Sequence, residues 1–345
     1  MVSHNVGILF ERSTKLAGND ISWASSATVV PRTEELIVGH SSDSEEYHQI
    51  MRVKYGIDEL IATITKEDIQ GLPISSLIEL YWSLASCRVW SDRLIKLLQQ
   101  QIALLVDSIS PSQAVFFLWA EAMFFNQNTE LDIEVNWADH SLLDITNIVF
   151  AYSFMKKRSD IVREGRNLLL TRNVSSGHGI RAIGFANYFL GEDLTGNAII
   201  AKHDKPSWRY TFELCLACQG IGGKVNVLPV VEKLFSFDAL YKTKGKKILL
   251  EIVRPQSVIR DLETGTIVNV DGYTAMSRTM LSEKGYLIIA ISTTEWTNLK
   301  GKQIGYLKRR IRNCLDKKTI LEAPERDFES DMDSSDSDTG SDMSY

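Results

Sequence analysis

Long apolar segments are missing from this sequence of 345 residues. No hydrophobic run approaches the roughly 20 residues that a membrane-spanning helix needs, which excludes a transmembrane protein. Cysteine is scarce too, and its four positions do not form the dense, regular framework of a secreted disulfide-rich domain. The sequence therefore indicates a reducing compartment and no membrane partner.

Catalytic and metal-binding patterns are also missing. The six histidines are scattered, without the spacing of a catalytic or metal site. Cys215 and Cys218 are spaced like metal ligands, but no second cysteine pair or nearby histidine completes a tetrahedral site. We expect them to be a buried helical pair, and we expect no catalytic residues, no metal and no cofactor.

Positive charge is hidden by the net charge of −6. Residues 322–345 hold nine acidic residues and one basic residue, so the rest of the chain carries 37 Lys and Arg against 35 Asp and Glu. Residues 242–318 hold sixteen basic and seven acidic residues, a local net charge of +9. This balance indicates a basic module that suits a nucleic-acid partner.

Both ends of the chain differ from its centre. Residues 1–48 are expected to be a leader or linker, and residues 1–30 contain a candidate mitochondrial transit peptide with Arg12 and Lys15, although Glu11 and Asp20 depart from that pattern. Residues 317–345 are too acidic and too poor in apolar groups to fold, so we expect a disordered acidic tail.

Residues 49–237 have helical periodicity throughout. Trp82 and Trp119 lie 37 residues apart on matching helix faces, and two Phe-Ala pairs, at 150–151 and 185–186, lie 35 residues apart; Ala217 follows 31 residues after Ala186. A period of 31–37 residues predicts a solenoid of helical hairpins. The alternative is an all-α domain without repeats, and in either case the two tryptophans are expected to pack in the core.

The periodicity changes after residue 240. Residues 244–253, 264–270 and 286–293 are expected to be strands. A helix is expected from about Tyr273 to Gly285, and a basic helix closes the domain at 301–315. Residues 243–316 are therefore expected to form a small α/β domain.

The region from Lys247 to Arg312 resembles a RAP domain, the C-terminal module of many organellar RNA-binding proteins, notably in apicomplexan parasites and algae. The second half of the motif carries most of the resemblance. The matching residues, in order, are LEIVRPQSV, Gly272 and Thr274, Arg278, Leu281, Gly285–Tyr286, LIIAI, Glu295–Trp296 and Tyr306–Leu307–Lys308–Arg309. Helical repeats of about 37 residues usually precede this module in the family, which agrees with the period observed here.

The resemblance implies a restriction-endonuclease-like fold and raises the question of nuclease chemistry. That chemistry needs an acid at a strand end and an acid-x-Lys motif on the next strand, which together hold a metal ion and a water molecule. Val253 and Arg254 replace the family's acid and glycine, Ser257 replaces its histidine, and Glu251 is left as a lone acid. We therefore expect a domain without enzymatic activity.

RNA binding does not need those groups. The closing helix and the turn before it offer phosphate contacts, and Trp296 beside that turn is a candidate for stacking on an unpaired base. The alternatives are a solvated helix face for the basic cluster and a core position for Trp296, while Arg278 is expected to be structural. The candidate RNA-binding residues are Lys300, Lys302, Lys308, Arg309, Arg310, Arg312 and Trp296.

The leading hypothesis is a non-catalytic RNA-binding protein that acts in mitochondrial RNA processing, stability or translation. Its partner would be single-stranded RNA or ribosomal RNA, together with proteins of a ribonucleoprotein. One alternative is a structural subunit of a mitochondrial ribonucleoprotein or ribosome, and a third hypothesis is a metal-dependent nuclease. Another organelle or the cytoplasm is the alternative location.

Overall fold

The computed structural model combines a helical region with mixed β-sheets, which confirms the expected mixture of α and β structure. None of the described helices has the length and apolarity needed to cross a membrane. The expected leader, and the expected acidic tail apart from Lys317, lie outside the described residues. Those residues are 64–126, 134–172, 174, 177–192, 208–232, 234–253, 257–262 and 264–317.

The first part of the described chain is helical, and local sequence signals set where its helices begin. Ser110 caps α7 by accepting a hydrogen bond from the backbone N–H of Gln113, and Pro111 occupies the first helical position. Helix α5 begins at Ile74, directly after Pro73. The helices are α4 (Lys66–Gln70), α5 (Ile74–Ser86), α6 (Asp92–Leu104), α7 (Pro111–Met123), α8 (Leu142–Met155), α9 (Ser159–Thr171) and α10 (Gly177–Leu190).

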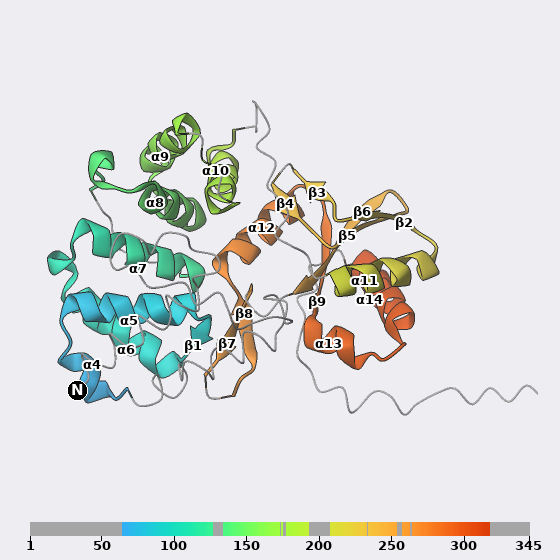
Figure 1. Ribbon diagram of the computed structural model, residues 1–345, viewed down its shortest axis with the longest axis horizontal. Coiled ribbons are helices and arrows are strands. Elements are labelled where there is room, and N and C mark those ends of the chain that lie inside the picture. The colour runs from blue at the N-terminus through green and yellow to red at the C-terminus, as the bar shows by residue number, and fades with distance from the viewer. Residues whose placement is uncertain are drawn as a thin grey trace, which may run out of the picture.

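Helices α5, α7, α8 and α10 pack side by side in chain order, with α6 beside α5 and α9 beside α8 and α10 (Figure 1). Trp82 of α5 and Trp119 of α7 are both buried, and their ring centroids lie 6.1 Å apart. Phe150 of α8 and Phe185 of α10 meet in the same way at 5.9 Å. The aromatic positions that recur in the sequence are therefore core contacts between neighbouring helices, as expected for the two tryptophans.

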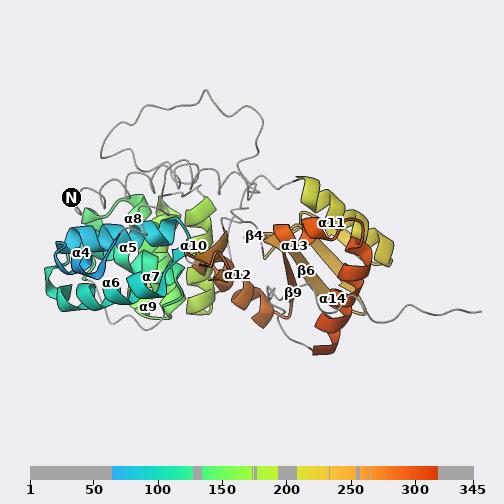
Figure 2. The ribbon, with the colours of Figure 1, turned by 90° about the horizontal axis from the view of Figure 1, so that it is seen from below.

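A four-stranded mixed sheet forms the centre of the C-terminal unit. Its strands are β2 (Lys224–Val227), β5 (Ala239–Thr243), β6 (Lys246–Val253) and β9 (Leu287–Ser292), in that order. The first three pair antiparallel, whereas β6 and β9 are parallel. Helix α12 (Gly272–Glu283) lies on one face of the sheet, and α11 (Trp208–Ile221) and α14 (Gln303–Lys317) lie on the other (Figure 2). The short helix α13 (Thr293–Asn298) follows β9 directly.

Helix α11 shows where the expected domain boundary differs from the packing. Its sequence pattern predicts a helix of the last repeat, but it packs against α14, β2 and β5. Its buried residues Leu214 and Ala217 share a hydrophobic core with Leu307 of α14. The C-terminal unit therefore includes α11, β2 and β5 and begins before residue 243.

A second, three-stranded sheet joins the helical region to the C-terminal unit. The hairpin of β7 (Val258–Asp261) and β8 (Ile267–Val270) adds in parallel to β1 (Val89–Trp90), the short strand between α5 and α6. The backbone N–H of Arg260 donates to the Arg88 carbonyl at 2.9 Å. Strand β7 was not expected from the sequence, whereas β6, β8, β9, α12 and α14 lie within about three residues of the expected elements.

The start of α12 is a second junction between the two regions. Asp271 caps α12 by accepting from the backbone N–H of Thr274 and also pairs with Arg88 at 3.4 Å. The buried ring of Tyr273 stacks on Phe150 of α8, with centroids 3.9 Å apart. These contacts fix the start of α12 against the helical region.

Candidate nucleic-acid interface

Helix α14 is amphipathic, and its two faces have different surroundings. Tyr306, Leu307 and Ile311 are buried in the core beneath the sheet. Three basic residues on the other side, Lys308, Arg309 and Arg312, are exposed, because positions three and four apart share one face of a helix. No ion pair with another described residue neutralises these three side chains. We call them, together with Lys300 and Lys302, the basic face.

Lys300 and Lys302 lie in the turn between α13 and α14. The turn is tight, with the backbone N–H of Lys302 donating to the Leu299 carbonyl at 2.9 Å, and both lysines are exposed. Lys300 (φ 40°) and Gly301 (φ 93°) both adopt left-handed backbone conformations. The structure thus places both lysines beside the first turn of α14, in continuity with the helix.

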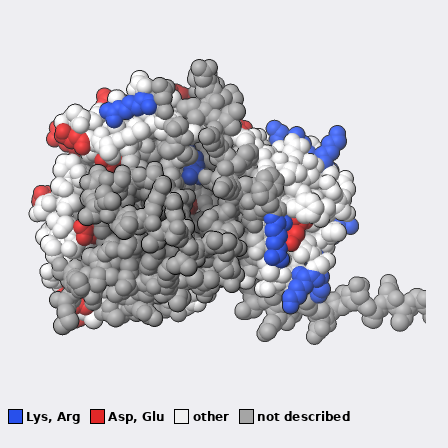
Figure 3. All heavy atoms as spheres, in the orientation of Figure 1, with Lys and Arg blue, Asp and Glu red and all other residues white. Residues whose placement is uncertain are grey.

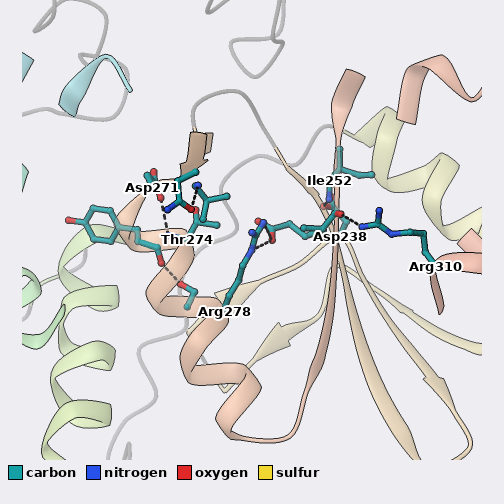
Figure 4. A network of polar contacts seen from close by, with 12 residues as sticks. Asp238, Ile252, Asp271, Thr274, Arg278 and Arg310 are labelled. Carbon is teal, nitrogen blue, oxygen red and sulfur yellow. Dashed lines mark hydrogen bonds and ion pairs between the residues drawn. The ribbon is translucent and has the colours of Figure 1, made fainter. Parts of the chain in front are cut away.

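Arg310 does not belong to the basic face. Its side chain is 13 % exposed, and its Nη2 donates to the carbonyl oxygen of Ala290 on β9 at 3.0 Å (Figure 4). Its Nη1 lies 3.7 Å from the carboxylate of Glu295. The expectation that Arg310 contacts RNA is therefore wrong, because these interactions fix the guanidinium between α14 and β9. The sequence carried a signal for this, since Arg310 lies midway between the buried Tyr306 and Cys314 at intervals of four residues.

The stacking role considered for Trp296 is wrong for a similar reason, and the alternative, a core position, is confirmed. The residue is fully buried in the core that contains Leu299 and Leu307. Its indole Nε1 donates to a carboxylate oxygen of Glu213 on α11 at 3.0 Å. A base cannot stack on this ring unless the C-terminal unit opens, so Trp296 is a core residue that links α13 to α11.

An exposed aromatic residue of this surface is Phe212, which no sequence pattern indicated. Its side chain is 63 % exposed on α11, and Leu216, one turn later, is 49 % exposed. One more turn along, Gly220 lies against Ile304 of α14: a Cβ on Gly220 would stand 2.8 Å from the Ile304 Cδ1. We call Phe212, Leu216 and Ile304 the apolar stripe. It borders the basic face, because Ile304 precedes Lys308 by one turn of α14.

Charged side chains are distributed unevenly over the molecule. In Figure 3, Lys and Arg predominate on the right-hand lobe, over the C-terminal unit, and Asp and Glu predominate on the left, over the helical region. The sequence predicted this separation from the local net charge of +9 in residues 242–318. The basic part of this surface attracts phosphate groups and other anions.

Two acidic residues at the sheet, Glu251 and Asp238, accept hydrogen bonds from other residues of the fold. Glu251 of β6 accepts from Nε and Nη2 of the buried Arg278 at 3.1 and 3.0 Å, which confirms a structural role for Arg278 (Figure 4). Asp238, which the sequence analysis did not consider, accepts from the Thr211 hydroxyl at 2.6 Å and the Ile252 N–H at 2.7 Å. Each of these carboxylates is therefore held by partners from within the fold.

The cysteine pair has the surroundings expected of core residues. Cys215 and Cys218 are both buried in α11. Burial raises the pKa of the Cys218 thiol to about 12, so the thiol form prevails at neutral pH. Among the described residues, no group of three or more His, Cys, Asp and Glu side chains could hold a metal ion.

Comparisons with known proteins do not place the chain in a family. No protein-family model matches the sequence, and no curated protein shows significant similarity to it.

Proposed function

We propose that the chain is a non-catalytic RNA-binding protein of the RAP-domain type. Single-stranded RNA would bind across the basic face and the apolar stripe of the C-terminal unit. The observation that carries this proposal is the exposed charge of Lys308, Arg309 and Arg312, which no ion pair with a described residue neutralises, on a helix that packs against α11 with its exposed Phe212. Basic side chains that contact phosphates, combined with an aromatic ring on which a base stacks, are typical of single-strand binding.

The fold supports the same proposal. The sheet lies between α12 on one face and α11 and α14 on the other, and this layered α/β/α unit agrees with the restriction-endonuclease-like fold that the RAP resemblance implies. The side-by-side packing of α5, α7, α8 and α10 supports a helical-repeat array before it. In this proposal the array is the scaffold that carries the RNA-binding unit.

A binding role is favoured over nuclease chemistry by the surroundings of Glu251. The Arg278 guanidinium donates two hydrogen bonds to Oε2 of Glu251, and Val253 stands where the family has its acid at the strand end. The positive charge of Arg278 disfavours a divalent cation at this position. We therefore assign no catalytic residue to the C-terminal unit.

The test of the proposed function is direct binding of the full chain to fluorescein-labelled oligouridine, followed by anisotropy over a series of salt concentrations. The proposal predicts binding that weakens linearly on a log–log plot as salt rises. The same titration with Mg²⁺ separates binding from cleavage. RNA cleavage that requires Mg²⁺ and is lost in Glu251→Ala would overturn the non-catalytic assignment.

The cellular setting we propose is mitochondrial RNA metabolism, with a ribonucleoprotein subunit as the second candidate. Sedimentation of the native protein with ribosomes would favour the subunit, whereas free protein would favour a factor that acts on RNA transiently. Import of a reporter that carries residues 1–50 would support the mitochondrial location, and retention in the cytosol would contradict it.

A further inference from the structure

Three lysines stand in a row across the sheet, away from the basic face of α14. Lys224 of β2 pairs in register with Lys242 of β5, and Lys242 pairs in register with Lys247 of β6. All three are exposed. Residues directly opposite one another on neighbouring strands point to the same face, and like charges in such positions destabilise a sheet. A row of three lysines therefore works against the stability of these strands.

The turn between β5 and β6 adds two more lysines. Thr243 pairs with Lys246, so Lys244 and Gly245 form a two-residue turn, and both have positive φ angles, of 46° and 73°. This geometry favours Asn, Asp or Gly at the first position, because other side chains are strained in the left-handed region. Lys244 occupies it nevertheless and is exposed. A residue that is unfavourable for the local conformation and buries nothing indicates a role for its charge.

Glu232 interacts electrostatically with Lys247 of the row, but its hydrogen bonds go to other residues. Glu232 accepts from the Lys284 Nζ at 2.8 Å and from the Tyr286 hydroxyl at 3.2 Å. The Lys247 Nζ lies 5.3 Å from the centre of the Tyr286 ring. Within the described part of the chain, no ion pair neutralises the three lysines of the row or the two lysines at the turn. We call these five residues, Lys224, Lys242, Lys244, Lys246 and Lys247, the lysine hairpin.

The lysine hairpin is close to the proposed RNA-binding surface. Gly220, at the end of α11, lies against Ile304 in the first turn of α14, and Lys224 follows Gly220 by four residues. Four residues span at most about 15 Å, and each neighbouring strand adds about 4.8 Å. In Figure 3, blue side chains project from the upper right of the C-terminal unit, over the end of the sheet that carries β2 and the β5–β6 turn. An extended polyanion can therefore contact both surfaces.

We propose that the lysine hairpin is a second phosphate-binding surface for the RNA strand that crosses the basic face. This inference rests on the proposed function and extends it, because it assigns a longer path to the bound strand. Each phosphate that the hairpin contacts releases bound counterions, so the hairpin contributes to the salt dependence of binding. Phosphate binding explains why lysines occupy the strained turn and the row, where they destabilise the local structure.

The test compares Lys244→Asn with Lys156→Asn in the full chain. Lys156 ends α8 with φ 55° and is also exposed, so the two substitutions remove the same charge from the same backbone conformation. Asn tolerates this conformation better than Lys, so both variants should melt at the same or a higher temperature than the wild type. A third variant, Lys242→Thr, removes the centre of the row and provides a good strand former.

The expected result is a change in binding to labelled oligouridine for the hairpin variants alone. Lys244→Asn and Lys242→Thr should each lower the magnitude of the log–log salt slope by about 0.7, the value for one phosphate contact on a single strand. Lys156→Asn should leave both Kd and slope unchanged. A lower slope at unchanged or higher melting temperature would support the proposal, since a merely structural role would not produce it.

Other results would overturn the inference in distinguishable ways. Unchanged slopes in both hairpin variants, with a reduced slope in Lys308→Gln, would reject the lysine hairpin and leave the proposed function standing. Equal decreases of the salt slope in Lys156→Asn and Lys244→Asn would mean that only the net charge of the protein matters for binding. Tighter binding by Lys244→Asn would mean that the hairpin holds the acidic residues 322–345 instead of RNA, and a wild-type chain that does not bind oligouridine would reject both proposals.

Discussion

Gly272 at the start of α12 lies directly against Ala122 near the end of α7. A Cβ placed on Gly272 would be 2.2 Å from the carbonyl oxygen of Ala122, closer than any real side-chain contact. The contact joins two residues 150 positions apart and lets Tyr273 reach Phe150 in the helical region. Glycine is thus required here by the close approach of two backbones.

Gly272→Ala is expected to destabilise the protein by about 2 kcal/mol, because the added methyl group pushes α12 away from α7. Urea denaturation measures the change in the free energy of unfolding. Gly305→Ala in α14 is the matched control: a Cβ there meets nothing within 4 Å. That variant should gain up to about 1 kcal/mol from the higher helix propensity of alanine. Equal changes in the free energy of unfolding for Gly272→Ala and Gly305→Ala would contradict the close contact between α12 and α7.

The buried Glu121 should make stability depend on pH. Burial raises the pKa of its carboxyl group above the ordinary value of 4.5, although Tyr81, Gln99 and Asn126 donate hydrogen bonds to it. The carboxyl group of Glu121 has a higher pKa in the folded than in the unfolded protein. Its favourable contribution to the free energy of unfolding is therefore complete below pH 4.5 and is lost as the pH rises through the raised pKa. Glu121→Gln should flatten this part of the pH profile of unfolding free energy. A variant profile parallel to that of the wild type would contradict the assignment.

Phe212 and Trp296 are expected to respond in opposite ways. Phe212→Ala should weaken oligouridine binding by about 1–3 kcal/mol, the range for one base stacked on an aromatic ring, with little change in melting temperature. Trp296→Ala should cost about 3–5 kcal/mol of stability, because it empties a fully buried site. Trp296→Phe, which keeps a ring in the core, should bind RNA like the wild type. Normal binding by Phe212→Ala would remove the apolar stripe from the interface.

The ion pair of Arg278 and Glu251 should behave as a coupled unit. Arg278→Met leaves the carboxylate, which is 21 % exposed, without its partner and is expected to cost about 2 kcal/mol. The double variant Arg278→Met/Glu251→Gln should recover part of that loss, since the remaining group is neutral. A double-mutant cycle measured by urea denaturation gives the coupling energy. Additive losses would show that the two side chains contribute independently.

Elements with strong local signals could be predicted from the sequence. Helix α7 has its Ser-Pro start, and β9 is a continuous apolar run between turn residues. The placement of α11 could not be predicted in this way, because an amphipathic pattern shows which face is buried but not which element covers it. Strand β7 is short, and its partner Val89 lies 171 residues before Arg260, so no local pattern indicates the pairing.

The same limit separates the candidate residues whose exposure could be predicted from those whose burial could not. Charge and helix periodicity were enough to predict the exposure of Lys308, Arg309 and Arg312. They could not show that Arg310 bonds to the Ala290 carbonyl or that Trp296 is enclosed by the core, since both depend on how α13 and α14 pack on the sheet. Phe212 was overlooked for the converse reason, because an aromatic residue in a helical pattern is ordinarily assigned to the core.

The most direct test of RNA binding by the basic face is the salt dependence of oligouridine affinity in the full chain and in Lys308→Gln/Arg312→Gln. The control, Lys66→Gln/Lys96→Gln, removes the same charge from exposed positions of α4 and α6. We predict that the basic-face variant binds more weakly at low salt and that the magnitude of its log–log slope falls by about 1.4, the value for two phosphate contacts, whereas the control matches the wild type. A basic-face variant with the affinity and slope of the wild type would contradict the account.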